Sequence, residues 1–451
     1  MAAPPPANRA QTPVLPAVET NSFRKAAFVL LCVYLISNLA NDFSARFFGS
    51  RAYLSVIAGA LLPLCCLASR FAFAGLNYPI GRWWAAFIVW MVLCIPTSFW
   101  PGGSTDATRE FFTKNYVLFF YVVAAVVSLS QLQILFRVMA TSGFLVILAC
   151  YFYGGYLDGR LLIPNSIFFD NSNDLGLQLL ISAGFFLYML NSRNILAKFA
   201  GAGLMGASLL YLLRTGSRST FVAVIVCIIA LFMLTKKKAL LMAAVALMAV
   251  IAAFAVSSNQ LSRLVYIVFD PEDQVSEENG ALMSQVARTE LLKRSIGLTF
   301  QHPVLGVGPG MFSEVIWAEG LKKGDRIDLK THNAYTQVSS EMGFPGLIFY
   351  VMTEFGALLL AFRIFKRADK NLGSNPQCEI IRNLALSLFL MLVGYSVSSI
   401  FNHVAYSRHL PTLAGMTIAL AVLAQREMKD VILLPFRVPW SRSHFDARVN
   451  R

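Results

Sequence analysis

Residues 221–256 read FVAVIVCIIALFMLTKKKALLMAAVALMAVIAAFAV, in which two apolar runs are separated by Lys236, Lys237 and Lys238. In lipid a helix must satisfy its own backbone hydrogen bonds, and it needs about 20 predominantly apolar residues to cross the hydrocarbon core. The stretch therefore predicts two membrane-spanning helices joined by a short basic turn.

Apolar runs of this kind recur along the whole chain of 451 residues, of which 57% are hydrophobic and 14% charged. Soluble domains carry about 25% charged residues, so this composition excludes a water-soluble globular protein. We predict an all-α polytopic membrane protein with about twelve transmembrane helices and one large, partly helical loop outside the membrane. The predicted spans are residues 26–40, 53–68, 83–99, 116–129, 134–152, 175–190, 195–213, 221–234, 239–256, 347–362, 384–401 and 411–424.

The predicted spans, the long gap between the ninth and tenth of them, and the two polar ends define five segments of the chain. They are a disordered cytoplasmic leader (1–25), spans one to nine (26–256), a large outer loop in which the functional residues are expected (257–346), spans ten to twelve (347–425) and a basic cytoplasmic tail (426–451). Within the loop we predict a helix over 284–300, a tight turn at 306–310, and a second helix over 333–342 that ends at Gly343 and Pro345.

The formal net charge of +14 indicates an orientation in the membrane and not a nucleic-acid partner. Lys and Arg concentrate in the cytoplasmic loops of membrane proteins. With the amino terminus inside, 22 of the 38 Lys and Arg residues fall in cytoplasmic segments, and flipping the chain would put the triple-lysine turn outside. We therefore expect both termini in the cytoplasm and the long loop on the outer side of the membrane.

One arginine in the predicted loop helix has no carboxylate close in sequence. Arg294 has Glu290 four residues earlier, whereas Arg288 has Ser284 and Leu292 at the corresponding positions. An arginine on an apolar helix face must find an anion elsewhere. That anion is either a structural Asp or Glu distant in sequence or a bound substrate.

The link after the seventh span also contains two arginines, Arg214 and Arg218, with no acid nearby. Ser219 or Thr220 can cap the next helix, whose N-terminal N–H groups would add to an anion site. Because guanidinium groups suit phosphate oxygens, Arg218 and Arg288 together could hold a diphosphate without a metal. The alternative is that these arginines anchor the link at lipid headgroups.

His332 opens the second predicted loop helix and is the strongest candidate for a general base. Near a helix N-terminus, and near arginines, the neutral and proton-accepting form of an imidazole is favoured. A lone histidine often has only a structural role, but here Asn333 and Tyr335 lie beside it. The combination favours acid–base chemistry.

Several other polar residues have weaker signals. Asn171, Asn173 and Asp174, at the outer edge of the sixth span, either cap that helix or line a polar cavity. Glu354, inside the tenth span, is costly in lipid and is expected to pair or to function. The acidic residues at 270–273 could ligate a cation, but we interpret them as a solvated loop.

The order of these motifs resembles the O-antigen ligases, membrane glycosyltransferases of the bacterial O-antigen ligase and polymerase superfamily. The resemblance covers residues 171–346, and the pattern of spans extends it to the whole chain. The matching residues are Thr215-Gly216-Ser217-Arg218-Ser219, Arg288, His302-Pro303 with Gly306, Gly308, Gly310 and Phe312, Thr331-His332-Asn333-Ala334-Tyr335, and Gly343 with Gly346.

This resemblance implies a GT-C-like enzyme of the bacterial inner membrane whose active site faces the periplasm. The donor would be an undecaprenyl-diphosphate-linked O-antigen, the acceptor a sugar of the lipid A core, and the product lipopolysaccharide; membrane lipids surround the protein. The reaction would be inverting and would need no metal or other cofactor. His332 would be the base, and Arg218 and Arg288 would bind the diphosphate. Residues expected to contact substrate are Arg214, Ser217, Ser219, Asn333, Tyr335 and Asn173.

Three alternatives differ in reaction or in class. An O-antigen polymerase joins repeat units, and a protein O-oligosaccharyltransferase of the same superfamily glycosylates protein hydroxyls. A lipid-linked oligosaccharide flippase is not an enzyme and needs a charged cavity within its spans. Glu354 is the only acid inside the predicted spans, which disfavours the flippase.

Overall fold

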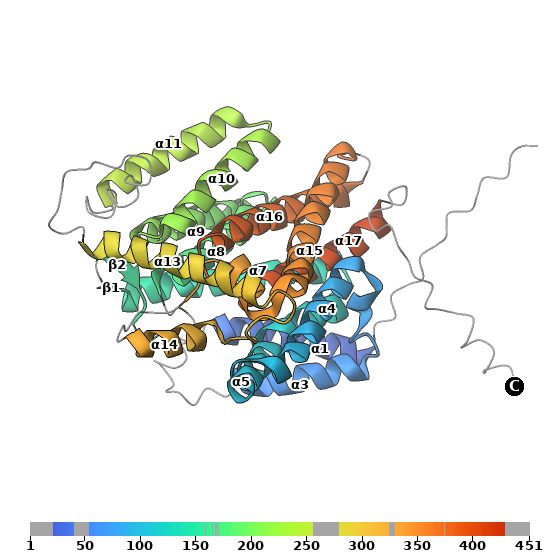
Figure 1. Cartoon of the computed structure of the whole chain (residues 1–451). Coiled ribbons are helices and arrows are strands. Elements are labelled where there is room, and N and C mark those ends of the chain that lie inside the picture. The colour runs from blue at the N-terminus through green and yellow to red at the C-terminus, as the bar shows by residue number, and fades with distance from the viewer. Residues whose placement is uncertain are drawn as a thin grey trace, which may run out of the picture.

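The computed structural model describes residues 21–39, 54–157, 159–164, 166, 169, 171–255, 279–323, 330–373 and 375–428, without the side chains of 38–39, 255, 279–288 and 321–323. These residues form a helical bundle (Figure 1). Its longer helices are α1 (Ser22–Leu39), α3 (Leu54–Ala68), α4 (Pro79–Cys94), α5 (Pro101–Phe111), α6 (Leu118–Ala125), α7 (Leu129–Tyr153), α8 (Ser172–Leu190), α9 (Ile195–Arg214), α10 (Arg218–Leu234), α11 (Lys238–Ala255), α13 (Asn279–Gln301), α14 (Phe312–Lys323), α15 (Ala334–Lys370), α16 (Pro376–Ser399) and α17 (His409–Glu427). Short elements are the 3-10 turns η1 (Ala74–Asn77) and η2 (Ile95–Thr97), the π-helical turn η3 (Phe112–Tyr116), and the strands β1 (Gly155–Leu157) and β2 (Arg160–Leu162).

Each predicted apolar segment overlaps a helix, which agrees with the all-α membrane character of the chain. Among the described residues, six helices are long and apolar enough to cross a membrane: Pro79–Thr97, Leu129–Tyr153, Ser172–Leu190, Ile195–Arg214, Ala334–Lys370 and Pro376–Ser399. The apolar helices α3, α10 and α11 are shorter. The full count of twelve spans and the periplasmic placement of the loop stay predictions.

The structure differs from the sequence-based elements at the fourth predicted span. Helix α6 alone, Leu118–Ala125, is too short to cross a bilayer at about 1.5 Å per residue. It continues α5 through the π-helical turn, so that one helical run extends from residue 101 to 125. The run begins at Pro101, whose fixed φ suits the first position of a helix. The hairpin β1–β2, with Gly159 at φ 69°, and helix α14 were also not expected.

The elements predicted for the long loop are present where its residues are described. Helix α13 contains the expected 284–300 segment, and Arg294 pairs with Glu290 at 3.2 Å, as its spacing predicts. Helix α15 begins after Asn333, and Gly343 leaves helical geometry (φ 67°, ψ −173°). The second loop helix therefore ends at this kink, as predicted, and the helix that carries the predicted tenth span begins directly after it; the label α15 covers both.

The interior of the bundle is built from aromatic side chains on α4, α15 and α16. Trp84, Phe87, Tyr350 and Tyr395 are fully buried, and Trp84 donates from Nε1 to the carbonyl of Tyr116 at 2.9 Å. Most of these contacts join helices that are distant in sequence.

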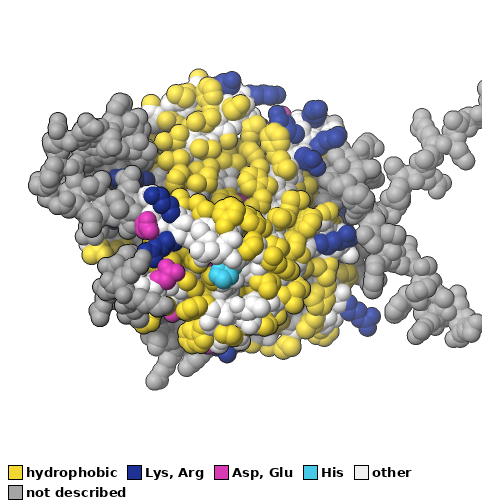
Figure 2. All heavy atoms as spheres, viewed as in Figure 1, with side chains coloured by type: hydrophobic (Ala, Val, Ile, Leu, Met, Phe, Trp, Pro, Cys, Tyr) yellow, Lys and Arg dark blue, Asp and Glu magenta, His cyan; other side chains and the backbone are white. Residues whose placement is uncertain are grey.

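The outer surface is largely apolar. Figure 2 shows a face dominated by hydrophobic side chains, with Lys and Arg gathered along the upper and right-hand edges. Phe199 on α9, Met233 on α10 and Phe254 on α11 are 71%, 75% and 90% exposed. Such a surface is unfavourable in water and suits a lipid environment.

Candidate functional site

His332 occupies an unusual backbone conformation at the start of α15. Its φ is 49°, and among the described residues only Arg70 shares a positive φ without being glycine. A left-handed conformation costs a non-glycine residue about 1–3 kcal/mol and persists only where its surroundings enforce it, often at functional sites. The ring of His332 packs edge-on against that of His403, with centroids 5.8 Å apart and planes at 84°.

Asn333 fixes the start of α15 and ties it to a neighbouring loop. Its Oδ1 accepts from the backbone N–H groups of Tyr335 and Thr336, both at 2.9 Å, and so caps the helix. Its Nδ2 donates to the carbonyl of Ile400 at 2.9 Å. The residue that follows His332 therefore positions both α15 and the chain segment that carries His403.

Tyr335 points toward the bundle. Its hydroxyl donates to Glu354 Oε1 at 3.0 Å and lies 3.4 Å from the carbonyl of Ser396. Glu354 is fully buried, so this bond supplies the pairing expected for an acid inside a span. Tyr335 thus joins the His332 end of α15 to its membrane portion and to α16.

The α16–α17 loop, residues 400–408, packs against His332 through His403. Besides the bond from Asn333, it is held by Tyr395, which donates from its hydroxyl to the carbonyl of Val404 at 3.0 Å. It is also held by Asn115, which donates from Nδ2 to the carbonyl of Tyr406 at 2.9 Å. Burial, with Lys330 and His332 nearby, lowers the pKa of His403 to about 3, so this histidine is neutral at ordinary pH.

A cavity of about 730 Å³ adjoins this loop. Its wall includes residues from α1, α3, the π-helical turn, the start of α8, the start of α15 and the α16–α17 loop. Polar side chains on the wall include Lys114, Asp174, Gln178, Lys330, Gln337 and His403. The volume lies within the range of sites for small organic molecules, about 300–1,000 Å³.

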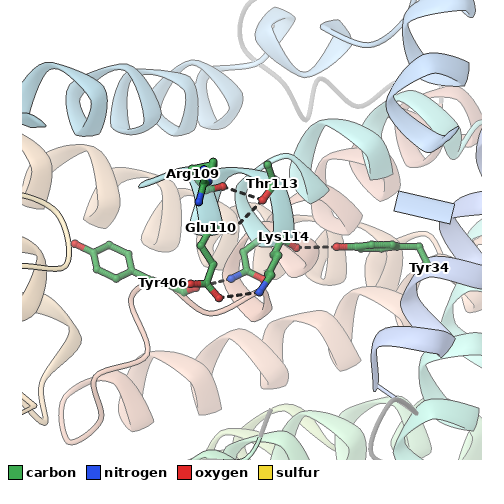
Figure 3. Close-up of polar contacts among 7 residues, drawn as sticks. Tyr34, Arg109, Glu110, Thr113, Lys114 and Tyr406 are labelled. Carbon is green, nitrogen blue, oxygen red and sulfur yellow. Dashed lines mark hydrogen bonds and ion pairs between the residues drawn. The ribbon is translucent and has the colours of Figure 1, made fainter. Parts of the chain in front are cut away.

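The π-helical turn on the cavity wall is held by contacts at two adjacent residues, Lys114 and Asn115 (Figure 3). Tyr34 donates from its hydroxyl to the carbonyl of Lys114 at 3.1 Å, and Asn115 holds the α16–α17 loop. Lys114 pairs with Glu110 at 2.8 Å. π-Helical turns occur frequently at functional sites because the extra residue redirects side chains.

The link between α9 and α10, which runs from Arg214 to Arg218, lies against the start of α8. We call it the arginine-bearing link. Arg160, on β2, donates to Asn173 Oδ1 at 2.7 Å and to the carbonyl of Thr215 at 3.1 Å. Asn173 is therefore next to the link, whereas the following residue, Asp174, is on the cavity wall. The start of α8 thus connects the link to the cavity beside His332. Arg160 was missed in the sequence because it lies in an unexpected hairpin.

Arg214 and Arg218 end α9 and begin α10, and both are half-buried. Ser217, not Ser219 or Thr220, occupies the cap position of α10, and its side chain makes no capping bond, so the predicted cap is wrong. Instead the hydroxyls of Ser217 and Ser219 lie 3.0 Å apart. Gly216, with φ 57°, lets the chain turn before the helix begins.

Two groups of candidate residues lie partly or wholly outside the residues that the structure describes. The backbone of Arg288 is in α13, but its side chain lies outside the described atoms. The acidic residues at 270–273 lie entirely outside the described residues. Asn171, by contrast, caps α8 by accepting from the N–H groups of Asn173 and Asp174, as one of its two interpretations predicts. Within the described part of the chain, no group of three His, Cys, Asp or Glu side chains could hold a metal ion.

Glu341 is a buried carboxylate that the sequence analysis missed. It accepts from the N–H groups of Gly310 at 2.7 Å and Phe312 at 3.4 Å, and from the hydroxyl of Tyr406. The predicted glycine turn is therefore fastened to α15 and to the α16–α17 loop through one side chain. The surrounding residues 334–342 are largely polar, so no local signal in the sequence distinguished this acid, unlike Glu354 in its apolar span.

Comparison with known proteins is consistent with the resemblance found in the sequence. A family model described as O-Antigen ligase matches residues 203–351. The match runs from α9 to α15 and so includes the arginine-bearing link, α13, the glycine turn and His332. No curated protein matches the chain.

Proposed function

We propose that this chain, whose residues 203–351 match a family model described as O-Antigen ligase, belongs to that superfamily and joins a lipid-linked glycan to the lipid A core to form lipopolysaccharide. The donor is a glycan on undecaprenyl diphosphate, and the acceptor is a sugar hydroxyl of the lipid A core. The reaction takes place at the periplasmic face of the bacterial inner membrane. It inverts the anomeric centre and needs no metal.

His332 acts as the general base in this proposal. It accepts the proton of the acceptor hydroxyl while the oxygen attacks the anomeric carbon of the donor sugar. The bond from that carbon to the diphosphate oxygen breaks at the same time, and undecaprenyl diphosphate leaves with the electron pair. Attack opposite the leaving group gives inversion. The observation that carries the proposal is the left-handed backbone of His332, whose ring packs against His403 on the wall of a polar cavity, within the matched domain.

The arginines stabilise the leaving group. Arg218 begins α10, where the helix N-terminus favours an anion, and Arg214 lies at the other end of the same link. Arg288 on α13 supplies a further guanidinium group for the diphosphate. Ser217, Ser219 and Asn173 contribute polar groups. Charge stabilisation of this kind is usually the largest single contribution to such a reaction.

Reconstitution tests the proposed reaction. Purified protein in liposomes is given undecaprenyl-diphosphate glycan and lipid A core, and the products are separated by size and lipid content. We expect glycan attached to the lipid A core, with unchanged yield after EDTA treatment. Glycan chains lengthened on undecaprenyl diphosphate would indicate a polymerase instead. Transbilayer movement of the donor without a new glycosidic bond would indicate a flippase.

A further inference from the structure

Arg24, near the start of α1, is a buried cation that uses little of its bonding capacity. It is 8% exposed, and among the described residues its side chain makes one hydrogen bond, from Nε to the carbonyl of Ala124 at 2.7 Å. That bond caps the end of α6 but occupies only one of the five N–H groups of a guanidinium. No described carboxylate forms an ion pair with Arg24. Because a buried charge without a counter-ion is unfavourable, Arg24 is suited to bind an anion.

The guanidinium group of Arg24 is held in place by the end of α3. Its Cζ lies 4.0 Å from the centroid of the Phe71 ring, in a cation–π contact. Asn21 accepts from the backbone N–H of Arg24 at 2.9 Å and donates from Nδ2 to the carbonyl of Ser69 at 3.3 Å. The cation is therefore positioned before any anion binds, which lowers the entropy lost on binding.

Two further arginines lie close to Arg24. Arg70, the residue before Phe71, is exposed and follows α3 with a φ of 65°. Glycine usually occupies such a left-handed position after a helix, so an arginine here is retained at a cost in backbone energy. Arg426 is in the last turn of α17. Burial, with the Arg426 guanidinium nearby, lowers the pKa of Arg24 to about 10, so Arg24 is still charged at neutral pH.

The side chains exposed around these arginines are apolar. Phe23 on α1, Leu67 on α3 and Phe73 after α3 are each more than half exposed. Cations beside an exposed apolar surface are typical of the boundary between the hydrocarbon and the headgroups of a membrane, where basic pockets between helices bind anionic headgroups. A phospholipid matches both parts of this surface, whereas a soluble anion matches only the cations.

We propose that Arg24, Arg70 and Arg426, which we call the α1–α3 arginine site, bind the headgroup phosphate of an anionic phospholipid. Guanidinium groups bind phosphate oxygens in a bidentate manner. The bound lipid supplies the counter-charge of Arg24 and holds the start of α1 against the ends of α3 and α6. In the predicted orientation the site faces the cytoplasmic leaflet. The proposal is independent of glycan transfer, since none of the three arginines belongs to the proposed active site.

Three variants test the α1–α3 arginine site. Arg70→Gly removes a guanidinium group and suits the left-handed backbone, so the fold is preserved. Arg24→Gln removes the buried charge and keeps an N–H donor for Ala124, whereas Arg24→Lys keeps the charge without the planar fork. Arg363→Gln, at an exposed arginine near the cytoplasmic end of α15, is the control for general attraction between basic side chains and anionic lipid.

The measurement is native mass spectrometry of the purified full chain in detergent, titrated with phosphatidylglycerol or phosphatidylcholine. We expect phosphatidylglycerol to bind more tightly. Loss of a charge-assisted hydrogen bond predicts that Arg24→Gln and Arg70→Gly each raise its Kd about tenfold, with a smaller rise in Arg24→Lys and no change in Arg363→Gln. Unchanged Kd values in Arg24→Gln and Arg70→Gly, or an equal change in the control, would overturn the site.

Two further titrations separate the lipid from other anions. Inorganic phosphate that displaced bound lipid as effectively as phosphatidylglycerol does would overturn the lipid assignment in favour of a soluble anion. Glu19 is the only acid in the first 23 residues of the chain. Phosphatidylglycerol binding that occurred only in Glu19→Gln would show that this acid, and not a lipid, is the counter-ion of Arg24.

Discussion

At the scale of single residues, Asn333 has two separable tasks. Its oxygen caps α15, and its amide holds the α16–α17 loop at Ile400. Loss of an asparagine cap costs about 0.5–2 kcal/mol, so we expect Asn333→Ala to lower the free energy of unfolding by that amount. Asn333→Asp keeps the acceptor and should retain most of the stability, yet both variants should lower kcat because His403 loses its support beside His332. Denaturant titration measures the change in stability, and turnover in liposomes measures kcat. A kcat of Asn333→Asp equal to that of wild type would contradict the role of Asn333 in supporting His403.

His403 makes stability depend on pH. Its pKa is about 3 in the folded protein, mainly because it is buried, and about 6.5 in an unfolded chain. Between these values the unfolded state binds the additional proton, so stability falls as the pH drops from 6.5 toward 3. We expect the Tm of His403→Gln to fall less steeply over this window than that of wild type. His302→Gln, at an exposed histidine, is the control, and equal slopes in wild type and His403→Gln would refute the expectation.

At the scale of elements, the bend of α15 sets the position of His332 relative to the membrane portion of the helix. Gly343 has φ 67°, and a Cβ there would lie 2.2 Å from the carbonyl oxygen of Val304. Phe344 donates from its backbone N–H to the carbonyl of Pro303 at 2.8 Å, which fastens the bend to the end of α13. The bend therefore requires glycine.

We expect Gly343→Ala to destabilise the protein by about 1–3 kcal/mol, because the left-handed backbone and the contact with Val304 are both unfavourable for alanine. Gly297→Ala is the matched control: it lies within α13 with nothing within 4 Å of the added Cβ. That substitution should stabilise the helix by about 0.5–1 kcal/mol. Thermal unfolding of both variants in detergent measures the difference, and equal Tm values would be incompatible with a bend that needs glycine.

The sequence predicts helices well where one physical rule dominates. Apolar runs identify the membrane helices, and Asn333 and Gly343 mark the cap and the bend of α15. Elements set by tertiary contacts were missed: the π-helical turn is fastened by Tyr34 and by the loop that Asn115 holds, both distant in sequence. The same limit applies to the site. His332 can be recognised from its neighbours in the sequence, whereas His403, Gln337 and Glu341 are brought to the site only by contacts between distant parts of the chain.

At the scale of the whole molecule, the distribution of charge predicts how the bundle lies in the membrane. The triple-lysine turn between α10 and α11 is expected in the cytoplasm, and α5 in the periplasm. We expect Thr105→Cys on α5 to react with a membrane-impermeant maleimide in intact spheroplasts. Lys237→Cys should react only after permeabilisation, with unsubstituted protein as the control for native cysteines. The reverse pattern would invert the predicted orientation.

The central claim is that His332 removes the proton from the acceptor hydroxyl. The most direct measurement is single-turnover transfer by reconstituted His332→Ala, compared with wild type and with His444→Ala, a histidine in the basic carboxy-terminal tail. General-base catalysis contributes about 10²–10⁴-fold, so the account predicts a fall of at least about a hundredfold in His332→Ala, with normal donor binding and normal transfer by His444→Ala. Transfer by His332→Ala at a rate near that of wild type would contradict the claim.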